Sequence, residues 1–417
     1  MLLRPRPTAV LALAALLPGC GDDGPAPVAQ TETTTATAST SAVDATGPAS
    51  SSTGPDDGSS TTDTGTDGTT GAPFEGRLLV TADWRNKTLT LADFDAIAQG
   101  ATTRAEVVVG EVDLAAWEPG PLQVEVTPDG ERAVVSISPG FFDGVVGGTI
   151  AAGDVPLDGT LLVVDLQARE VLAELPTAHV PMGIAISPDG STAFTANYGH
   201  SDAPGSTLSV VDLETLTVLE DVEVGQRPEQ VTLNADGALG LVNLAGDGTV
   251  VVFDPIDVAG TLSTPLEVSA DPSDVDFIEG TTRAVVANSA DPFTYTVFDL
   301  ADPSTPTFVA EGTEPLPFPY ALTRVPGTPD VLMTIAANPM RVLRIDGTAP
   351  EAAVWNAQVD DVRSFPLGVA IDAAAGLAFI GAPGPNVLVV QPLDGSPART
   401  LDWLPQTGPT YVAIGPG

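Results

Sequence analysis

The chain of 417 residues carries 55 acidic and 15 basic side chains, for a formal net charge of −40, and Lys87 is its single lysine. This composition excludes nucleic-acid binding and direct adhesion to anionic lipid headgroups, since both need clustered Lys and Arg side chains. Two interpretations of the charge remain: solubility in salty surroundings, which we favour, or recruitment of cations or of a basic partner.

A secretory signal is predicted at the start of the chain. Two arginines precede an apolar run at residues 9–17, and the run ends in the sequence LPGC at residues 17–20. A basic start followed by a short apolar segment is typical of a signal peptide, and this run is too short to span a bilayer as a stable helix.

The LPGC sequence resembles the lipobox of bacterial lipoproteins. The resemblance implies that residues 1–19 are removed and that Cys20, the only cysteine of the chain, is lipidated as the mature N-terminus. Gly21 stands where some lipoproteins carry the Asp that retains them at the inner membrane, so the resemblance favours the cell envelope at the outer membrane or cell surface. The alternative is an ordinary signal peptide with a chance cysteine. A sole cysteine also excludes a disulfide within the chain.

Residues 20–73 are predicted to be the lipidated cysteine followed by a disordered tether. Ser and Thr make up 21 of the 40 residues 31–70. Such a stretch has almost nothing apolar to bury, so it cannot offset the entropy of ordering its backbone. Asp63 and Asp67 hint at calcium loops, but the fixed spacing of an EF-hand is absent. We favour a solvated stalk that lifts a domain off a membrane.

From residue 74 onward the chain is a repeat array. Each unit opens with a proline and continues through an alternating strand such as MGIAI, a turn such as PDG, a second strand, and a third strand ending in a sequence such as VVDL. A fourth strand leads to the next proline. Alternation punctuated by Pro, Asp and Gly is typical of antiparallel strands joined by tight turns. The opening prolines are Pro121, Pro181, Pro228, Pro272, Pro319, Pro366 and Pro409.

Seven prolines and four strands per unit predict an all-β fold, a seven-bladed β-propeller of four-stranded blades over residues 74–417. The chain ends on a first strand at residues 411–414 and begins with a second and a third strand at residues 77–82 and 89–94. We expect these fragments to share one blade and to close the ring without an unpaired edge. An open β-solenoid, the alternative, leaves both fragments unexplained.

The repeat also resembles a known family. The pattern Pro-x-x-hydrophobic-x-hydrophobic-x-Pro-Asp-Gly, then a strand ending in Asn, then hydrophobic-Val-Asp-Leu, resembles the YVTN-type β-propeller repeat of bacterial and archaeal surface proteins. It is similar to the repeats of lactonase-like and quinoprotein-type propellers. The resemblance covers the whole region after the tether and is tightest in the units that open at Pro181 and Pro228. It implies the fold, whereas this architecture hosts many unrelated activities.

Candidate ligand-binding residues are expected in two sets of loops. In a propeller of this topology, the loops from fourth to first strands and from second to third strands share the face around the central channel, where most known propeller sites lie. An insertion at residues 139–159 belongs to the same face and could act as a lid. The candidate residues are Asp83, Trp84, Arg85, His179, Asn197, Tyr198, His200, Arg227, Asn288, Asn338, Arg363 and Phe365.

Polar residues that recur in most units are interpreted as structural. Aspartates end the third strands, and a catalytic residue would break the repeat, so these aspartates are expected to be turn residues. The asparagines that end second strands are expected to bond the local backbone. The aspartates are Asp165, Asp212, Asp254 and Asp299.

Three functions remain open. We favour a non-enzymatic binding or protein-interaction scaffold, monomeric and held at the membrane by lipid alone, with an unknown protein or small-molecule partner. A lactonase-like hydrolase would need acids and a histidine in one pocket, and no carboxylate pair can be singled out from the sequence. A metal or redox propeller would use His179, His200 and Asp202, which form only a partial site. No catalytic residue, cofactor or catalytic metal is assigned, although structural Ca²⁺ could stabilise an acidic ring.

Overall fold

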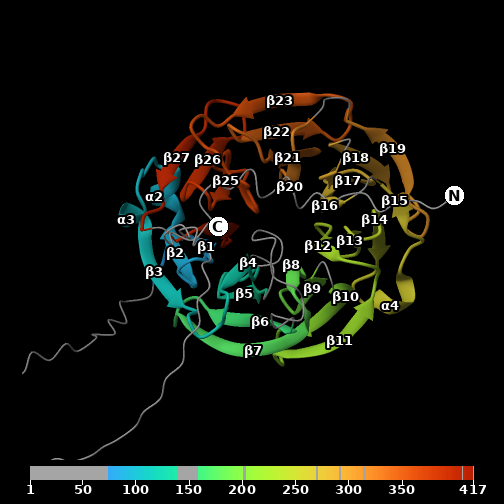
Figure 1. Cartoon of the computed structure of the whole chain (residues 1–417), viewed down its shortest axis with the longest axis horizontal. Helices are drawn as coiled ribbons and strands as arrows, with labels where there is room; N and C mark the ends of the chain where they lie inside the picture. The colour runs from blue at the N-terminus through green and yellow to red at the C-terminus, as the bar shows by residue number, and fades with distance from the viewer. Residues whose placement is uncertain are drawn as a thin grey trace, which may run out of the picture. The chain divides into compact units, whose positions relative to one another are not determined.

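A computed structural model of the chain describes residues 74–138, 158–200, 203–268, 271–290, 293–312, 316–405 and 407–416. These residues form seven four-stranded antiparallel sheets, arranged as blades around a central axis (Figure 1). The prediction of a seven-bladed β-propeller is therefore confirmed. The predicted signal peptide, Cys20, the tether, residues 139–157 of the insertion and Asp202 lie outside the described residues.

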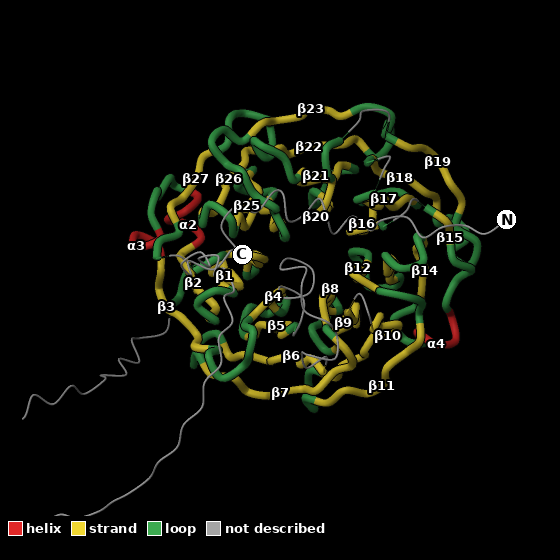
Figure 2. The backbone as a smooth tube through the Cα atoms, in the orientation of Figure 1, coloured by secondary structure: helices red, strands yellow, loops and turns green. Residues whose placement is uncertain are grey.

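Each blade places its first strand innermost and its fourth strand at the rim (Figure 2). The first strands are β4 (Pro121–Val126), β8 (Pro181–Ile186), β12 (Pro228–Leu233), β16 (Pro272–Ile278), β20 (Pro319–Arg324), β24 (Val369–Asp372) and β28 (Pro409–Ile414). The second strands are β5 (Arg132–Ile137), β9 (Thr192–His200), β13 (Gly240–Leu244), β17 (Arg283–Asn288), β21 (Asp330–Ile335), β25 (Leu377–Ala382) and β1 (Leu78–Asp83).

The outer half of each blade follows the same order. The third strands are β6 (Asp158–Asp165), β10 (Ala203–Asp212), β14 (Thr249–Phe253), β18 (Thr294–Asp299), β22 (Arg341–Asp346), β26 (Val387–Pro392) and β2 (Thr88–Asp93). The fourth strands are β7 (Glu170–His179), β11 (Thr217–Glu223), β15 (Leu266–Glu267), β19 (Thr307–Glu311), β23 (Ala353–Gln358), β27 (Arg399–Asp402) and β3 (Val108–Asp113).

One blade is assembled from both ends of the propeller. Strand β28 pairs antiparallel with β1, with Leu79 opposite Ile414 and Val80 opposite Ala413, and β1 continues into β2 and β3. Because β28 supplies the innermost strand, the inner edge of β1 is paired and this blade has four strands like the others. The expected closure of the ring is confirmed.

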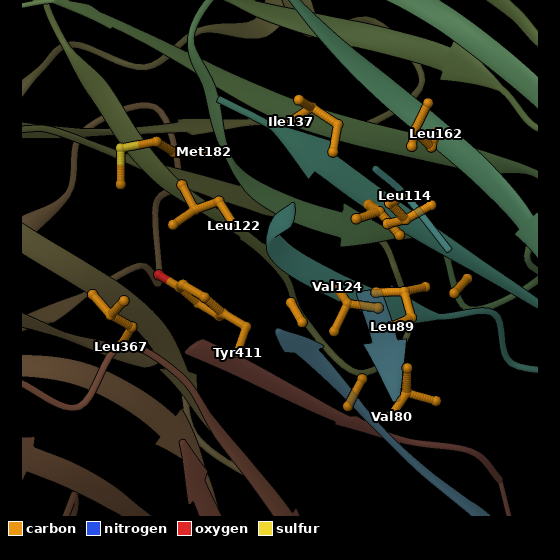
Figure 3. Close-up of a cluster of buried hydrophobic side chains, with 14 of the residues drawn as sticks. Val80, Leu89, Leu114, Leu122, Val124, Ile137, Leu162, Met182, Leu367 and Tyr411 are labelled. Atoms are coloured by element: carbon orange, nitrogen blue, oxygen red, sulfur yellow. The ribbon is translucent and has the colours of Figure 1, made fainter. Parts of the chain in front are cut away.

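The core consists of apolar layers between neighbouring blades. Inner strands such as β1 are buried at every position, since they are covered by a blade on each side, whereas the rim strand β7 alternates between exposed and partly buried residues. The largest layer joins the composite blade to the blade of β4; Figure 3 shows Val80, Leu89 and Val124 packed in it. Burial of this kind, at roughly 25 cal/mol per Å² of apolar surface, is the main favourable contribution to folding.

The aspartates that end third strands are turn residues, as predicted. Asp165 Oδ1 accepts the N–H groups of Gln167 (2.8 Å) and Ala168 (2.7 Å). Asp212 accepts those of Glu214 and Thr215, both at 2.8 Å. The side chain satisfies backbone donors that the turn leaves without a partner, which is why Asp recurs at this position.

Three short helices interrupt the connections from third to fourth strands. The helices are α2 (Phe94–Ala98), α3 (Arg104–Val107) and α4 (Val258–Thr261). Asp93 caps α2 by accepting the N–H of Ala96, and Asp257 caps α4 by accepting that of Gly260. All three helices lie at the rim of the ring, away from the axis (Figure 2).

The loops before the first strands and those after the second strands lie on one face of the ring, which we call the entrance face. In four blades a backbone N–H near the end of the second strand donates to the carbonyl of the residue that precedes the opening proline. These pairs are Tyr198 to Val180 (3.0 Å), Ala245 to Arg227 (2.9 Å), Ser289 to Asp271 (3.0 Å) and Ala336 to Phe318 (2.9 Å). The turns between first and second strands lie on the opposite face, which we call the turn face.

Candidate functional site

The central channel is lined by the first strands. Successive side chains of a strand point to opposite sides. The residues two and four positions after each opening proline face the axis, whereas those three positions after it, such as Val124 and Val275, are buried in the blades. A cavity of about 450 Å³ lies in the channel and touches all seven first strands. Its volume is in the range of small-molecule binding sites.

A break in the strand register widens the start of the channel. In six blades the pairing between first and second strands shifts just after the proline, for example between Pro121 and Val124 and between Pro228 and Val231. Such a bulge bends the strand and re-aims the side chains beside it. The residue two positions after the proline is thereby presented to the channel in each of these blades.

Two hydrogen bonds cross the channel near the entrance face and form the floor of the cavity. Gln230 Nε2 donates to the hydroxyl oxygen of Tyr411 at 2.7 Å, and the Tyr320 hydroxyl donates to Glu229 Oε1 at 2.9 Å. Figure 3 shows the hydroxyl of Tyr411 directed away from Val80 and Leu89. Beyond this floor the cavity continues to the turn face, where turn residues Pro188 and Ala235 line it.

Glycine makes room for these crossing side chains. A Cβ atom added to Gly183 would lie 2.6 Å from Cα of Gln230, and one added to Gly368 would lie 2.5 Å from Cδ1 of Tyr411. Real Cβ atoms do not come so close to other heavy atoms. The blade with Gly183 also places Ala185 in the cavity wall, and the blade with Gly368 places Ala370 there. The side chains of these two blades are therefore small where they face the cavity.

Three other blades contribute acidic and basic groups. Asp276 lies 3.4 Å from Arg324 Nε and also accepts the Arg324 backbone N–H at 2.8 Å and the Thr232 hydroxyl at 3.1 Å. The Arg324 guanidinium in turn donates to the Thr232 hydroxyl and the Leu233 carbonyl. Arg324 is therefore fully engaged with the protein, and Asp276 is the partner that balances its charge.

Glu125 and Asp274 face the same cavity without a basic partner of their own among the described contacts. Asp274 accepts the backbone N–H groups of Val275 and Leu322, both at 2.7 Å. Gln123 Nε2 donates to Glu125 Oε1 at 3.4 Å, which is a long hydrogen bond. Both carboxylates keep a partly exposed side chain because they border the cavity, although they lie deep within the ring.

Burial raises the pKa of these acids. Loss of hydration raises the pKa of Glu125 to about 7, and the nearby charge of Asp276 adds to the effect. Loss of hydration also raises the pKa of Asp274 well above its usual value, with further contributions from Asp276 and Glu125. At the floor, burial raises the pKa of Glu229 well above its usual value, and the negative charge of Asp271 raises it further.

The side chain of Gln123 has an oxygen without a partner. Gln123 is 4% exposed and lines the cavity, and its Oε1 accepts no hydrogen bond among the described residues. Buried polar atoms in folded proteins are nearly always hydrogen-bonded, to protein, water or ligand. This oxygen is therefore an unsatisfied acceptor in the wall of the cavity, itself covered by neighbouring atoms.

An aromatic cluster lies on the entrance side of the floor. The ring of Phe365 is 4.5 Å from that of Tyr320 and 5.4 Å from that of Phe318. The guanidinium of Arg227 lies 4.4 Å from the ring centroid of Tyr198, a distance at which the cation–π interaction is attractive. Of the twelve candidate residues, Tyr198, Arg227 and Phe365 are thus the ones that the structure places beside the floor of the channel.

Several other candidate residues are engaged within the blades. Asp83 is fully buried in the composite blade, where it accepts the hydroxyls of Thr81 (2.8 Å) and Thr90 (2.6 Å) and the indole N–H of Trp403 (3.3 Å). Burial raises the pKa of Asp83 to about 6. The buried position and saturated contacts of this carboxylate indicate a structural role.

The asparagines that end second strands follow expectation only in part. Asn243 bonds the backbone as expected, accepting the N–H of Gln230 at 3.0 Å and donating to the carbonyl of Pro272 at 2.7 Å, whereas Asn197 and Asn288 bond side chains. Asn197 Nδ2 donates to the hydroxyls of Thr207 and Ser209, and Asn288 Nδ2 to that of Thr296. These are side chains of the adjacent third strand, whereas we expected the local backbone. The reason is register, since a third-strand hydroxyl lies directly across the ladder from the end of the second strand.

The remaining candidates are spread over the entrance face. Trp84 and Arg85 follow β1, and their backbone N–H groups donate to Gly408 and Thr407. His179 is half exposed, with Nδ1 3.5 Å from Asp158, and His200 is buried. Asn338 and Arg363 are exposed. The ligand-binding role of all twelve residues stays a prediction.

The acidic residues of the channel wall were not found from the sequence, although a signal for them exists. The inner strands read LQVEV, EQVTL and SDVDF in three units but MGIAI and LGVAI in two others. Polar residues at positions two and four of the former strands face the axis, where the latter carry Gly and Ala. Alternation alone predicts a half-buried strand and does not show that its polar side faces a channel rather than the outer surface.

The described residues contain no group of three or more His, Cys, Asp and Glu side chains arranged to hold a metal ion. They also contain no helix with the length and apolar character that crossing a membrane requires.

Comparison with known proteins relates the chain to other propellers by structure only. No family model matches the sequence, and no curated protein matches it. The periplasmic gluconolactonase of Pseudomonas aeruginosa is similar in structure, with a TM-score of 0.61, 15% identity and coverage of 81% of this chain and 98% of that one. A functionally unknown protein from Desulfotomaculum acetoxidans gives a TM-score of 0.60, 13% identity and coverage of 82% and 100%.

Hydrazine synthase of Kuenenia stuttgartiensis is a more distant neighbour. Its TM-score is 0.51 at 17% identity, over 66% of this chain and 77% of that one. At such identities the likeness extends to the fold alone, because propellers of one architecture host unrelated activities. By structure the chain is a seven-bladed β-propeller, similar in fold to a bacterial periplasmic lactonase.

Proposed function

We propose that the protein is a binding propeller that takes a small polar solute into its central channel from the turn face. The observation that carries this proposal is the 450 Å³ cavity into which Glu125, Asp274 and the unpaired Gln123 oxygen are directed. If no ligand bound in the channel, we would expect the channel wall to carry small or apolar side chains in every blade, as the blades with Ala185 and Ala370 do. Polar groups are costly to bury unless they find partners.

A channel-filling substitution tests this proposal. Ala370→Leu adds a larger side chain to the cavity wall, and Thr307→Leu adds the same side chain to the exposed rim strand β19 as a control. The full-length protein and both variants would be screened by thermal unfolding against a panel of small polar solutes. A solute that binds in the channel raises the Tm of the wild type and of Thr307→Leu but not of Ala370→Leu. Equal shifts in all three proteins would place binding elsewhere and refute the proposal.

A hydrolase is the second candidate function, and the pKa of Glu125 favours it. A carboxyl group with a pKa of about 7 is suited to general acid–base catalysis near neutral pH. The similar fold of a gluconolactonase makes a sugar lactone the first substrate to assay. Lactone hydrolysis by the wild type that is lost in Glu125→Gln, and kept in the exposed-acid control Glu174→Gln, would replace the binding proposal by an enzymatic one.

We propose further that the propeller is attached to the cell envelope through lipidated Cys20 at the end of a flexible tether. The LPGC sequence and the Ser/Thr-rich segment that follows support this proposal. Metabolic labelling with radioactive palmitate would test it. Incorporation of the label into the wild type but not into Cys20→Ser supports lipidation. A wild-type protein that carries no label, and whose signal peptide is cleaved at another position, would indicate an ordinary secretory signal.

A further inference from the structure

The principal donors at the cavity wall already make contacts within the protein, whereas several acceptors there make few. The Arg324 guanidinium pairs with Asp276, and the Thr232 hydroxyl donates to the same carboxylate at 3.1 Å. The Gln230 amide donates to the Tyr411 hydroxyl at 2.7 Å.

The acceptors, by contrast, have capacity to spare. An ionised carboxylate has about four lone-pair sites. Asp274 accepts two backbone N–H groups, and Glu125 accepts one long hydrogen bond from Gln123. The Gln123 carbonyl oxygen accepts none among the described residues, although the side chain is 4% exposed. This unpartnered oxygen is independent of the carboxylates and also requires an N–H or O–H donor.

The charge of the cavity points in the same direction. Three carboxylates, those of Glu125, Asp274 and Asp276, share the wall with one guanidinium, that of Arg324. Grouping like charges away from bulk water is unfavourable, and an opposite charge within about 4–6 Å relieves it. Anions would be repelled from this wall. A positively charged ligand would compensate Glu125 and Asp274 in the way that Arg324 compensates Asp276.

The arrangement fits an extended cation better than a metal ion. The described acids are not arranged as a group of three that could hold one ion. The cavity is also far larger than an ion, and Ca²⁺ would need six to eight oxygen ligands at about 2.3–2.6 Å. An organic cation several atoms long can reach Glu125 and Asp274 at different points along its length.

We propose, building on the channel site proposed above, that its ligand is a small organic cation with two or more N–H donors, of the diamine or guanidino-amine class. One cationic group binds Glu125, and the other binds Asp274. The small wall formed by Ala185 and Ala370 accommodates the aliphatic part of the ligand.

Calorimetric titration of the full-length protein with 1,4-diaminobutane tests this inference, with butane-1,4-diol and succinate as neutral and anionic probes of similar length. We expect saturable binding of the diamine alone. Glu125→Gln and Asp274→Asn should each weaken it by about tenfold or more, since each removes a charge-assisted hydrogen bond. Glu174→Gln, which removes an exposed acid from the rim strand β7, should leave it unchanged.

The possible results separate the ligand class from the site. Failure of the diamine to bind at millimolar concentration, or binding that both channel variants leave unchanged, overturns the inference. If the diol or succinate binds instead and Ala370→Leu abolishes that binding, the channel site stands and the cationic class is wrong. If the diamine binds the wild type, Ala370→Leu and Glu174→Gln equally, and high salt abolishes that binding in all three, it binds the acidic surface and the cationic ligand is wrong; the channel site is then decided by the solute panel.

Discussion

Replacing Glu125 by Gln is expected to stabilise the propeller, and to do so increasingly as the pH rises. Burial raises the pKa of this carboxyl from its ordinary value of 4.5 to about 7. Below pH 4.5 the side chain is protonated in both the folded and the unfolded state, so it has no effect on stability. Between pH 4.5 and about 7 the unfolded chain releases this proton to water while the folded protein retains it, so the fold loses stability over that range; above pH 7 both states are ionised and the penalty stays constant.

The size of the effect follows from the two pKa values. A separation of about 2.5 pKa units corresponds to about 3 kcal/mol at pH 8, where the penalty is nearly complete, and to about 1 kcal/mol at pH 5. The amide of Gln has nearly the same shape and cannot ionise. Glu125→Gln should therefore raise the free energy of unfolding by up to about 3 kcal/mol at pH 8 and by much less at pH 5.

Urea unfolding at pH 5 and pH 8, followed by tryptophan fluorescence, measures this difference. Glu174→Gln serves as the control, because Glu174 is exposed on β7 and its replacement should change stability equally little at both pH values. A Glu125→Gln effect of the same size at pH 5 and pH 8 would refute the reasoning. It would show that the carboxyl is not perturbed by burial and that water fills the channel to its floor.

Three further predictions concern the floor and the closure of the ring. Tyr320→Phe removes the donor to Glu229 Oε1 and leaves that buried carboxyl without it, so it should lower the free energy of unfolding by about 1–3 kcal/mol; urea titration measures this. Trp403→Ala removes a fully buried indole from the composite blade and should cost about 3–5 kcal/mol, read as a lowered urea midpoint. Deleting β28 uncovers the inner edge of β1 and should abolish the near-UV circular dichroism of the folded ring and cause aggregation.

Most of the fold could be predicted from the sequence because each blade repeats the same local chemistry. Pro cannot donate to a ladder and is tolerated at the start of an edge strand, so it marks the innermost strand of a blade. Asp at the end of the third strand marks a turn, and the contacts of Asp165 and Asp212 confirm it. The short helices were not predicted, because helices of four or five residues present no periodicity and rest on single caps such as Asp93.

The composite blade could be predicted for a different reason. The first and last fragments of the array each lack the strands that the other supplies, and only a closed ring satisfies both. The structure shows this pairing between Leu79 and Ile414. The start of β24 was predicted less well: it begins at Val369, three residues after Pro366, and it is the one first strand that lacks the register shift.

The candidate site could not be placed from the sequence, because its residues come from five different blades and meet only across the axis. Gln230 and Tyr411 are 181 residues apart, and Tyr320 and Glu229 are 91 apart. Loop residues were therefore favoured, since loops carry most binding residues in known folds. In this propeller the entrance-face loops hydrogen-bond to each other, and the cavity opens toward the opposite face.

The repeat itself distinguishes structural residues from candidate functional ones. A side chain needed to build a blade should recur from blade to blade, as the turn aspartates do in most of them. The channel-facing positions of the first strands do not recur: they hold Glu125 in one blade, Asp276 in another, and Ala185 and Ala370 in two more. All seven inner strands occupy equivalent places in the ring, so blade construction gives no reason for this difference. Burial of the acids at these positions lowers the stability of the fold. Binding of a ligand that compensates their charge would explain why the sequence carries them.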